Sequence, residues 1–512
     1  MFILKKTTMK KLIVVSISLI AALSFKSIST SITDIIKWPN VTPPVADINP
    51  YKRAIHGDTV VDNYYWMIDY FKKGRDSSKV VKYLKAENEY LDTMMSATKS
   101  FQQKLFTEMK SRIKEKDESA PVFKNGYYYY TRSETGKQYF KYCRKKGTLA
   151  SKEEILFDAD EMAQGHPYYS AAGFNVSEDN NLLAYGVDTV SRRQYIIHIK
   201  NLVTGETYSD AIHNTSGSSV WANDNKTLFY TAKNPETLLT EKIKRHRLGS
   251  NESEDETVYE ENDKSNYIGV VKSKSEKYII IHTGGTLSSE TRYIKASEPD
   301  ATFKVFQPRI KEVLYEVTAL DDKFLIVTNW KAKNFRLMEC PLDKTDSTQW
   351  KEVIPHREDV LLSGIEEFKN FLVISERKNG LVQLKIKDLK NNNESYLNFD
   401  EPAYMAYVGA NPEYNTTTLR YNYTSLTTPS SEFDYNMSTK QKKLVKQQDV
   451  LGGYNSKDYL TERLYATAMD GTKIPVSIVY KKGFKKDGNS PLLLYAYGSY
   501  GISTDAVSIA HA

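Results

Sequence analysis

One short pattern recurs through the middle of this 512-residue chain. In each copy a polar turn precedes an apolar or alternating run that is rich in β-branched and aromatic residues, which is the composition of a β-hairpin. Seven copies open at Lys124, Ser177, Ala222, Lys274, Leu320, Ile365 and Asn411. Neighbouring copies start about 45 to 55 residues apart, as four-stranded propeller blades do. The repeat therefore predicts a seven-bladed β-propeller over residues 119–446. A pair of β-sandwiches would also show regular strands, but a period that persists over about 320 residues favours the propeller.

The sequence changes character on both sides of the repeat. Within residues 43–118, Val80, Val81, Leu84 and Leu91 fall on one helical stripe, and this segment is predicted to form two amphipathic helices. Within residues 447–512, "LTERLYATAMDGTKIPVSIVYKKG" predicts a hairpin around an Asp-Gly turn. The following "SPLLLYAYGSYG" predicts a buried strand of an α/β sheet that runs into a glycine-rich turn. These flanks indicate one α/β domain interrupted by an inserted propeller.

The first thirty residues have the order of a secretory signal peptide. A basic stretch, "MFILKKTTMKK", precedes the apolar run from Leu12 to Leu23 and the small polar residues "SFKSISTS". Residues 1–30 are therefore predicted to be a signal peptide, and the protein to be exported to the periplasm or the extracellular space. The apolar run is shorter than the roughly 20 residues of a transmembrane helix. Because no clear small-x-small cleavage site follows, an uncleaved membrane anchor stays open as an alternative.

Charge and motif content exclude several classes of function. The chain carries 71 basic and 64 acidic residues that are interspersed, and no basic cluster contains interleaved aromatics, so no nucleic-acid partner is predicted. The sequence contains no HExxH or Walker motif, and Cys143 and Cys340 lie far apart without metal-ligand spacing. We therefore predict neither a metal nor a cofactor. The two cysteines are interpreted as buried free thiols, with a disulfide as the alternative in an exported protein.

Several long strings resemble a known family. "HGDTVVDNYYWM", "VSRRQYIIHIKNLVTGE", "VWANDNKTLFYTAKNP" and "YAYGSYG" are similar to the N-terminal two-thirds of the oligopeptidase B branch of the prolyl oligopeptidase family of serine peptidases. The resemblance implies a seven-bladed β-propeller inserted in an α/β-hydrolase domain, here truncated within residues 447–512. It also implies a serine endopeptidase that hydrolyses short peptides after Lys or Arg, with the propeller as a size filter.

The resemblance also bears on individual residues. A serine hydrolase needs a nucleophile, a histidine base, an orienting carboxylate and oxyanion donors, with the serine in a G-x-S-x-G elbow. "GSYG" at 498–501 is one residue short of that elbow because position 497 is tyrosine. The Ser/Asp/His triad is therefore expected to be absent from this chain, and the chain alone to be inactive. Motif matching implies that the Tyr497 hydroxyl helps to form the oxyanion hole and that Tyr500 lies near the pocket for the residue before the scissile bond. Aromatic packing at a strand end is the alternative for both.

Two other functions remain open on the sequence. One is a propeller that binds peptides or a partner without turnover. The other is the N-terminal half of a split enzyme, whose partner would be a separate C-terminal peptidase fragment. The eight histidines do not distinguish these functions, because none has a serine elbow or metal-ligand spacing beside it. They are interpreted as structural.

Overall fold

The computed structural model describes residues 37–72 and 77–508. The chain divides between Ile113 and Lys114 into two compact units, which are described separately. The predicted signal peptide lies outside the described residues. Within residues 37–72 and 77–508, no helix has both the length and the apolar character needed to cross a membrane.

The first unit contains a two-stranded ribbon and two longer helices. Its elements are β1 (Tyr51–Ile55), β2 (Asp58–Asp62), η1 (Tyr65–Ile68), α2 (Asp69–Lys72), α3 (Ser78–Met94), η3 (Met95–Thr98) and α4 (Lys99–Ser111). The ribbon turns at His56 and Gly57, which both have positive φ as a two-residue type I′ hairpin requires. Helices α3 and α4 occupy the interval in which the apolar periodicity predicts two helices, and Val80 is the buried residue of α3.

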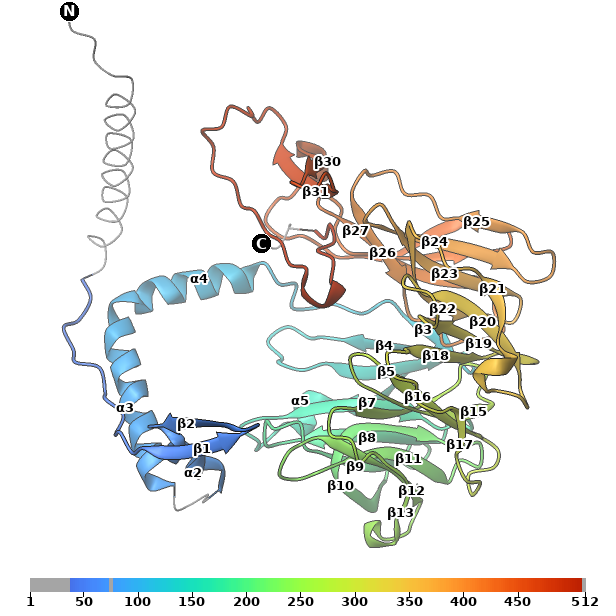
Figure 1. Ribbon diagram of the computed structural model, residues 1–512, viewed down its shortest axis with the longest axis horizontal. Coiled ribbons are helices and arrows are strands. Elements are labelled where there is room, and N and C mark those ends of the chain that lie inside the picture. The colour runs from blue at the N-terminus through green and yellow to red at the C-terminus, as the bar shows by residue number, and fades with distance from the viewer. Residues whose placement is uncertain (1–36, 73–76, 509–512) are drawn as a thin grey trace, which may run out of the picture. The chain divides into compact units, whose positions relative to one another are not determined.

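The second unit contains five four-stranded antiparallel sheets, which are the blades of a propeller (Figure 1). The blades are β3 (Val122–Lys124), β4 (Tyr127–Arg132), β5 (Lys141–Lys146) and β6 (Glu153–Asp158); β14 (Tyr267–Lys272), β15 (Tyr278–Gly284), β16 (Ser289–Lys295) and β17 (Lys304–Gln307); β18 (Tyr315–Ala319), β19 (Lys323–Thr328), β20 (Arg336–Pro341) and β21 (Lys351–Ile354); β22 (Val360–Glu367), β23 (Phe371–Lys378), β24 (Leu381–Asp388) and β25 (Glu394–Tyr396); β26 (Tyr404–Val408), β27 (Thr418–Ser425), β28 (Ser431–Asn436) and β29 (Lys442–Gln447). Short helices α5 (Ala159–Met162), η4 (Glu252–Glu254) and η5 (Ser347–Gln349) lie in the connections.

The prediction of seven separate blades is wrong, because residues 170–260 form one continuous seven-stranded sheet. Its strands are β7 (Ser170–Val176), β8 (Leu182–Asp188), β9 (Tyr195–Asn201), β10 (Thr207–Trp221), β11 (Thr227–Lys233), β12 (Thr240–Arg247) and β13 (Glu256–Glu260). Strand β10 is 15 residues long. It pairs with β9 through Thr207–Thr215 and with β11 through Thr215–Trp221, so two successive hairpins share one strand. Turn residues mark the hairpins in the sequence, but they do not show that a strand continues from one hairpin into the next.

Apolar clusters join the sheets that follow one another along the chain. Phe229 of β11 packs with Ile279 and Ile281 of β15, and Val373 of β23 packs with Tyr421 of β27. The first and last blades also meet, because the Arg420 guanidinium on β27 donates to the Pro121 carbonyl at 2.7 Å. The sheets therefore form a closed ring, which excludes the pair of β-sandwiches.

After the ring, the structure contains η6 (Ser456–Asp458), the hairpin of β30 (Tyr459–Thr467) and β31 (Lys473–Lys481), and η7 (Ser499–Gly501). The hairpin forms where the sequence predicts it. The predicted strand over Leu492–Tyr497 does not form, and the side chains of Leu492, Leu493 and Leu494 are exposed. The prediction of an α/β-hydrolase domain is therefore wrong for residues 447–508, where the only sheet is this two-stranded ribbon. A strand needs a neighbour for its backbone groups, and none of the described residues supplies one.

Candidate functional site

Tyr497 lies in a loop that Thr504 closes. The Tyr497 backbone N–H donates to Thr504 Oγ1 at 3.1 Å, and Thr504 Oγ1 donates to the Tyr497 carbonyl at 3.3 Å. We call residues 497–504 the Tyr497 loop. The Tyr497 side chain is 52% exposed, and among residues 37–72 and 77–508 its hydroxyl has no hydrogen-bond partner. A phenol in this state can donate a hydrogen bond, but no described side chain completes an oxyanion hole around it.

Tyr500 occupies the tip of the same loop. Its φ of 57° is left-handed, which is unusual for an aromatic residue, and its side chain is 89% exposed. Tyr500 is not among the residues that line the cavity described below. The assigned roles of Tyr497 and Tyr500 therefore stay predictions.

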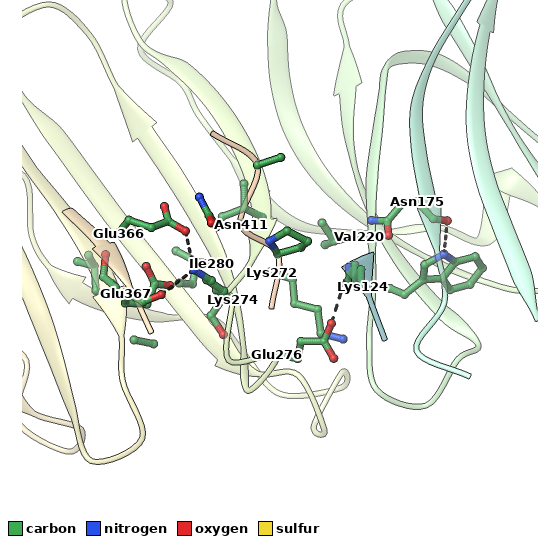
Figure 2. Close-up of a pocket in the computed structure, with 18 of the residues that line it drawn as sticks. Lys124, Asn175, Val220, Lys272, Lys274, Glu276, Ile280, Glu366, Glu367 and Asn411 are labelled. Carbon is green, nitrogen blue, oxygen red and sulfur yellow. Dashed lines mark hydrogen bonds and ion pairs between the residues drawn. The ribbon is translucent and has the colours of Figure 1, made fainter. Parts of the chain in front are cut away.

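A second candidate site is a cavity of about 760 Å³ at the centre of the ring (Figure 2). All six sheets of the ring supply lining residues, including Lys124, Asn175, Lys274, Glu316, Glu366 and Asn411. Because every sheet of the ring contributes lining residues, the cavity lies along the axis around which the sheets are arranged.

Ion pairs connect different sheets across this cavity. Lys274 Nζ, at the β14–β15 turn, lies 2.5 Å from Glu366 Oε1 on β22 and donates to the Glu367 carbonyl at 2.6 Å. Lys272 Nζ at the end of β14 lies 2.5 Å from Glu178 Oε1 in the β7–β8 turn. Lys274 thus joins two blades that are not neighbours in the chain (Figure 2).

Burial changes the protonation of the groups that line the cavity. It raises the pKa of the Glu367 carboxyl to about 7. It also raises the pKa of Glu276, to which the Glu178 carboxylate contributes, and it lowers the pKa of His282. Since charged forms are unfavourable away from water, the cavity combines paired lysines with one carboxyl group, that of Glu367, whose pKa lies near neutral pH.

Sequence reasoning missed these charged residues. The available signal was their position, because Lys124, Lys274 and Glu366 lie in the opening residues of the repeat copies. In a propeller, turns at the same point of successive repeats gather around one axis.

The thiols and the acidic groups give no further reaction centre. Cys143 and Cys340 are free and buried, and burial raises the pKa of the Cys143 thiol to about 11 and that of Cys340 to about 12. Thiols of this kind are poor nucleophiles. In the described part of the chain, no group of three or more His, Cys, Asp or Glu side chains could hold a metal ion.

Comparison with known protein families shows to which family this chain belongs. Residues 43–448 match the family described as prolyl oligopeptidase, N-terminal beta-propeller domain. This chain belongs to the prolyl oligopeptidase family. The match covers the ring of sheets described above, so the family assignment and the fold agree.

Several relatives within the prolyl oligopeptidase family are peptidases by name. Dipeptidyl aminopeptidase BI of Pseudoxanthomonas mexicana is 41% identical over 495 residues, which cover 93% of this chain and 68% of that protein. Protease 2 of Moraxella lacunata is 32% identical over 469 residues, which cover 90% of this chain and 66% of that protein. The solved structure of oligopeptidase B from Leishmania major superposes with a TM-score of 0.83 at 29% identity, covering 91% of this chain and 69% of that one. The chain thus spans about two thirds of the length of these relatives.

Proposed function

We propose that this chain is the propeller-bearing part of an oligopeptidase B-like serine endopeptidase that hydrolyses short peptides after Lys or Arg. The observation that carries the proposal is the likeness to oligopeptidase B structures, at a TM-score of 0.83 over 91% and 92% of this chain. The 41% identity to a named peptidase over 93% of the chain supports a peptidase more broadly. In this proposal the Ser/Asp/His triad is not part of the chain, Tyr497 is an oxyanion donor and Tyr500 borders the substrate pocket.

The central cavity supports a size filter. A cavity of about 760 Å³ has room for a few residues of an extended peptide, and the Lys274–Glu366 ion pair crosses it. A folded domain is too large to enter such a space. In the proposed enzyme the propeller therefore admits short peptides and excludes folded proteins.

Export through a signal peptide over residues 1–30 is part of the proposal. Its support is the order of the basic, apolar and small polar stretches in the sequence. N-terminal sequencing of the secreted or periplasmic protein tests it, and a mature chain that begins near residue 30 is the expected result.

A second candidate is the removal of dipeptides from the N-terminus of a peptide. The name of the Pseudoxanthomonas mexicana relative, dipeptidyl aminopeptidase, favours it. The two activities differ in one requirement, because an endopeptidase accepts a blocked N-terminus and an aminopeptidase requires a free ammonium group.

The purified 512-residue chain tests both candidates. It is incubated with two fluorogenic peptides that share an Arg before the reporter amide, one N-terminally acetylated and one free. We expect no turnover from the chain alone. Turnover that a serine-directed phosphonate abolishes would contradict the expected absence of the triad, and the preferred peptide would then identify the activity.

Binding experiments distinguish the proposed enzyme from a propeller that binds peptides without turnover and from the N-terminal half of a split enzyme. Fluorescence anisotropy of the acetylated Arg peptide, with a folded protein that carries the same sequence as the control, measures whether the propeller takes short peptides without turnover. Copurification of a separate peptidase fragment from the native source would support a split enzyme.

A further inference from the structure

The tip of one propeller hairpin contacts both segments that follow the ring. Strands β23 and β24 are joined through Asn379 and Gly380, which both have positive φ, and Lys378 pairs with Leu381 across this two-residue turn. An Asn-Gly type I′ turn is a tight and well-defined hairpin connection. We call residues 377–381 the β23–β24 tip.

The first contact is an ion pair between the tip and the residue that follows the Tyr497 loop. Arg377 Nη1 donates to Asp505 Oδ1 at 2.6 Å, and Arg377 Nη2 donates to Asp505 Oδ2 at 2.8 Å. The Arg377 side chain is 20% exposed and that of Asp505 is 14% exposed. A bidentate guanidinium–carboxylate pair fixes both the distance and the orientation of its partners.

Neighbouring contacts make this attachment continuous with the Tyr497 loop. Thr504, which holds both backbone groups of Tyr497, directly precedes Asp505. Ala506 is buried, and the Ser508 backbone N–H donates to Thr424 Oγ1 on β27 at 3.1 Å. Residues 504–508 therefore lie on two propeller blades, while the side chains of Tyr497 and Tyr500 stay exposed.

The second contact reaches the same tip from the β30–β31 hairpin. Arg463 Nη2 donates to the Asn379 carbonyl at 3.1 Å, and Arg463 Nη1 donates to Ser477 Oγ at 2.8 Å. A Cβ at position 380 would lie 2.6 Å from Arg463 Nη2 and 3.1 Å from Pro475 Cγ. Glycine at 380 thus supplies both the left-handed backbone and the room for this approach.

We propose that Arg377 is a positioning residue, and that its pair with Asp505 holds the Tyr497 loop at a fixed place on the propeller. The catalytic meaning of that place rests on the proposed function, but the attachment itself does not. Because both partners are largely buried, the loss of either one leaves an uncompensated charge. Without the pair, the Tyr497 loop loses its strongest link to the ring while the ring keeps its own contacts.

Hydrogen exchange on the 512-residue chain tests the proposal. Asp505→Asn and Arg377→Gln are each expected to accelerate exchange of the peptide that covers residues 495–505 at least about tenfold, because each variant breaks the two charge-assisted hydrogen bonds of the bidentate pair. The matched control is Lys378→Gln, because Lys378 is the next residue of β23 and also pairs with a carboxylate, Asp359 at 3.0 Å, but both partners are more exposed. It is expected to leave this peptide unchanged.

A charge swap and a spectroscopic probe separate positioning from general stability. The double variant Arg377→Asp with Asp505→Arg is expected to restore slow exchange. A 3-fluorotyrosine at position 497 should give a fluorine signal that moves toward that of free tyrosine in Asp505→Asn and returns in the swapped chain.

Three results would overturn the proposal. They are an Asp505→Asn chain that exchanges like Lys378→Gln, a swapped chain that behaves like the single variants, and equal acceleration of the β27 strand and the Tyr497 loop. Asp505→Asn keeps the test available should Arg377→Gln fail to fold. The readouts involve no peptide, so a failure of the proposed peptidase function would leave them unaffected.

Discussion

At the scale of single residues, His246 is buried between two carboxylates. Its Nδ1 lies 2.8 Å from Asp255 Oδ1 and its Nε2 lies 3.0 Å from Asp210 Oδ2. A neutral imidazole has one N–H group, so donation to both carboxylates requires the imidazolium. Burial opposes this charge, but the hydrogen bonds to Asp255 and Asp210 outweigh it and raise the pKa of His246.

His246 therefore makes stability depend on pH. A group whose pKa is raised in the folded state stabilises the fold fully below its unfolded pKa, about 6.5, and loses that effect as pH rises through the folded value. We expect His246→Gln to lower the free energy of unfolding by about 1–3 kcal/mol at pH 6 and by less at pH 9. Urea denaturation at the two pH values measures this. His213→Gln is the control, because His213 is exposed and contacts a single carboxylate, Glu252. An equal loss at both pH values would contradict the expectation.

Glu367 gives stability the same direction of pH dependence as His246, but through a carboxyl group whose ionisation is opposed by burial. Its pKa is raised to about 7 in the folded protein by burial, so the folded state binds the proton more tightly and stability falls as pH rises between the unfolded and folded pKa values. Glu367→Gln should match the parent chain at pH 4.5 and be more stable at pH 8, by on the order of 1–2 kcal/mol. Thermal unfolding at the two pH values measures the difference. Glu236→Gln, at an exposed carboxylate outside the cavity, should change neither value; a stabilisation that is independent of pH would refute the explanation.

At the scale of elements, β10 depends on a glycine. Gly217 has φ +86°, and a Cβ there would lie 2.8 Å from Tyr195 Cγ. It sits where the β10–β11 register shifts between Thr215 and Ser219, as at a β-bulge. The shared strand of the seven-stranded sheet therefore turns at a position that has no room for a side chain.

Alanine substitutions at Gly217 in β10 and at Gly249 after β12 separate the cost of backbone strain from the cost of crowding. Gly249 has a similar φ, +84°, and a Cβ there would meet nothing within 4 Å. We expect Gly249→Ala to cost about 1 kcal/mol through its backbone conformation alone, and Gly217→Ala to cost about 1–3 kcal/mol more through overpacking. Urea midpoints of the two variants measure the difference. Equal midpoints would show that Tyr195 moves away without cost.

Sequence patterns predict the hairpins well and their assembly less well. Asn125, Asn180 and Asn225 take left-handed φ values in the polar turns that open three of the repeat copies, because a turn is decided by a few consecutive residues. The length of β10 and the absence of a strand at Leu492–Tyr497 were not predictable in this way. Both depend on whether a neighbouring strand is present to receive the backbone hydrogen bonds.

At the scale of the whole ring, ion pairs reinforce the junction between the first and last blades. Lys446 of β29 lies 2.6 Å from Asp117 Oδ2 and also donates to the Glu118 carbonyl. Lys114 lies 2.7 Å from Asp449 Oδ2. No strand is exchanged between the two blades, so side chains provide the polar links between them. We call this junction between the first and last blades the seam.

Removing Lys446 should weaken the seam in a salt-dependent way. Lys446→Ala is expected to lower the free energy of unfolding by about 0.5–1 kcal/mol at low salt, the range for partly exposed pairs, and by less in 1 M salt, where charges are screened. Lys443→Ala is the control, because Lys443 is an exposed residue of the same strand. Urea unfolding of both variants at the two salt concentrations measures the effect, and a loss that is unchanged by salt would argue against an electrostatic seam.

The sequence by itself determined the repeat, the position of its turns, the two helices before the ring and the hairpin after it, because alternation, helical periodicity and turn residues act over a few neighbouring positions. Only the tertiary structure decided that two hairpins share β10, that Lys274 reaches Glu366 across the ring, and that Arg377 meets Asp505 over a separation of 128 residues. Those outcomes depend on backbone pairing and charge contacts between distant segments, and such contacts exist only once the ring has closed.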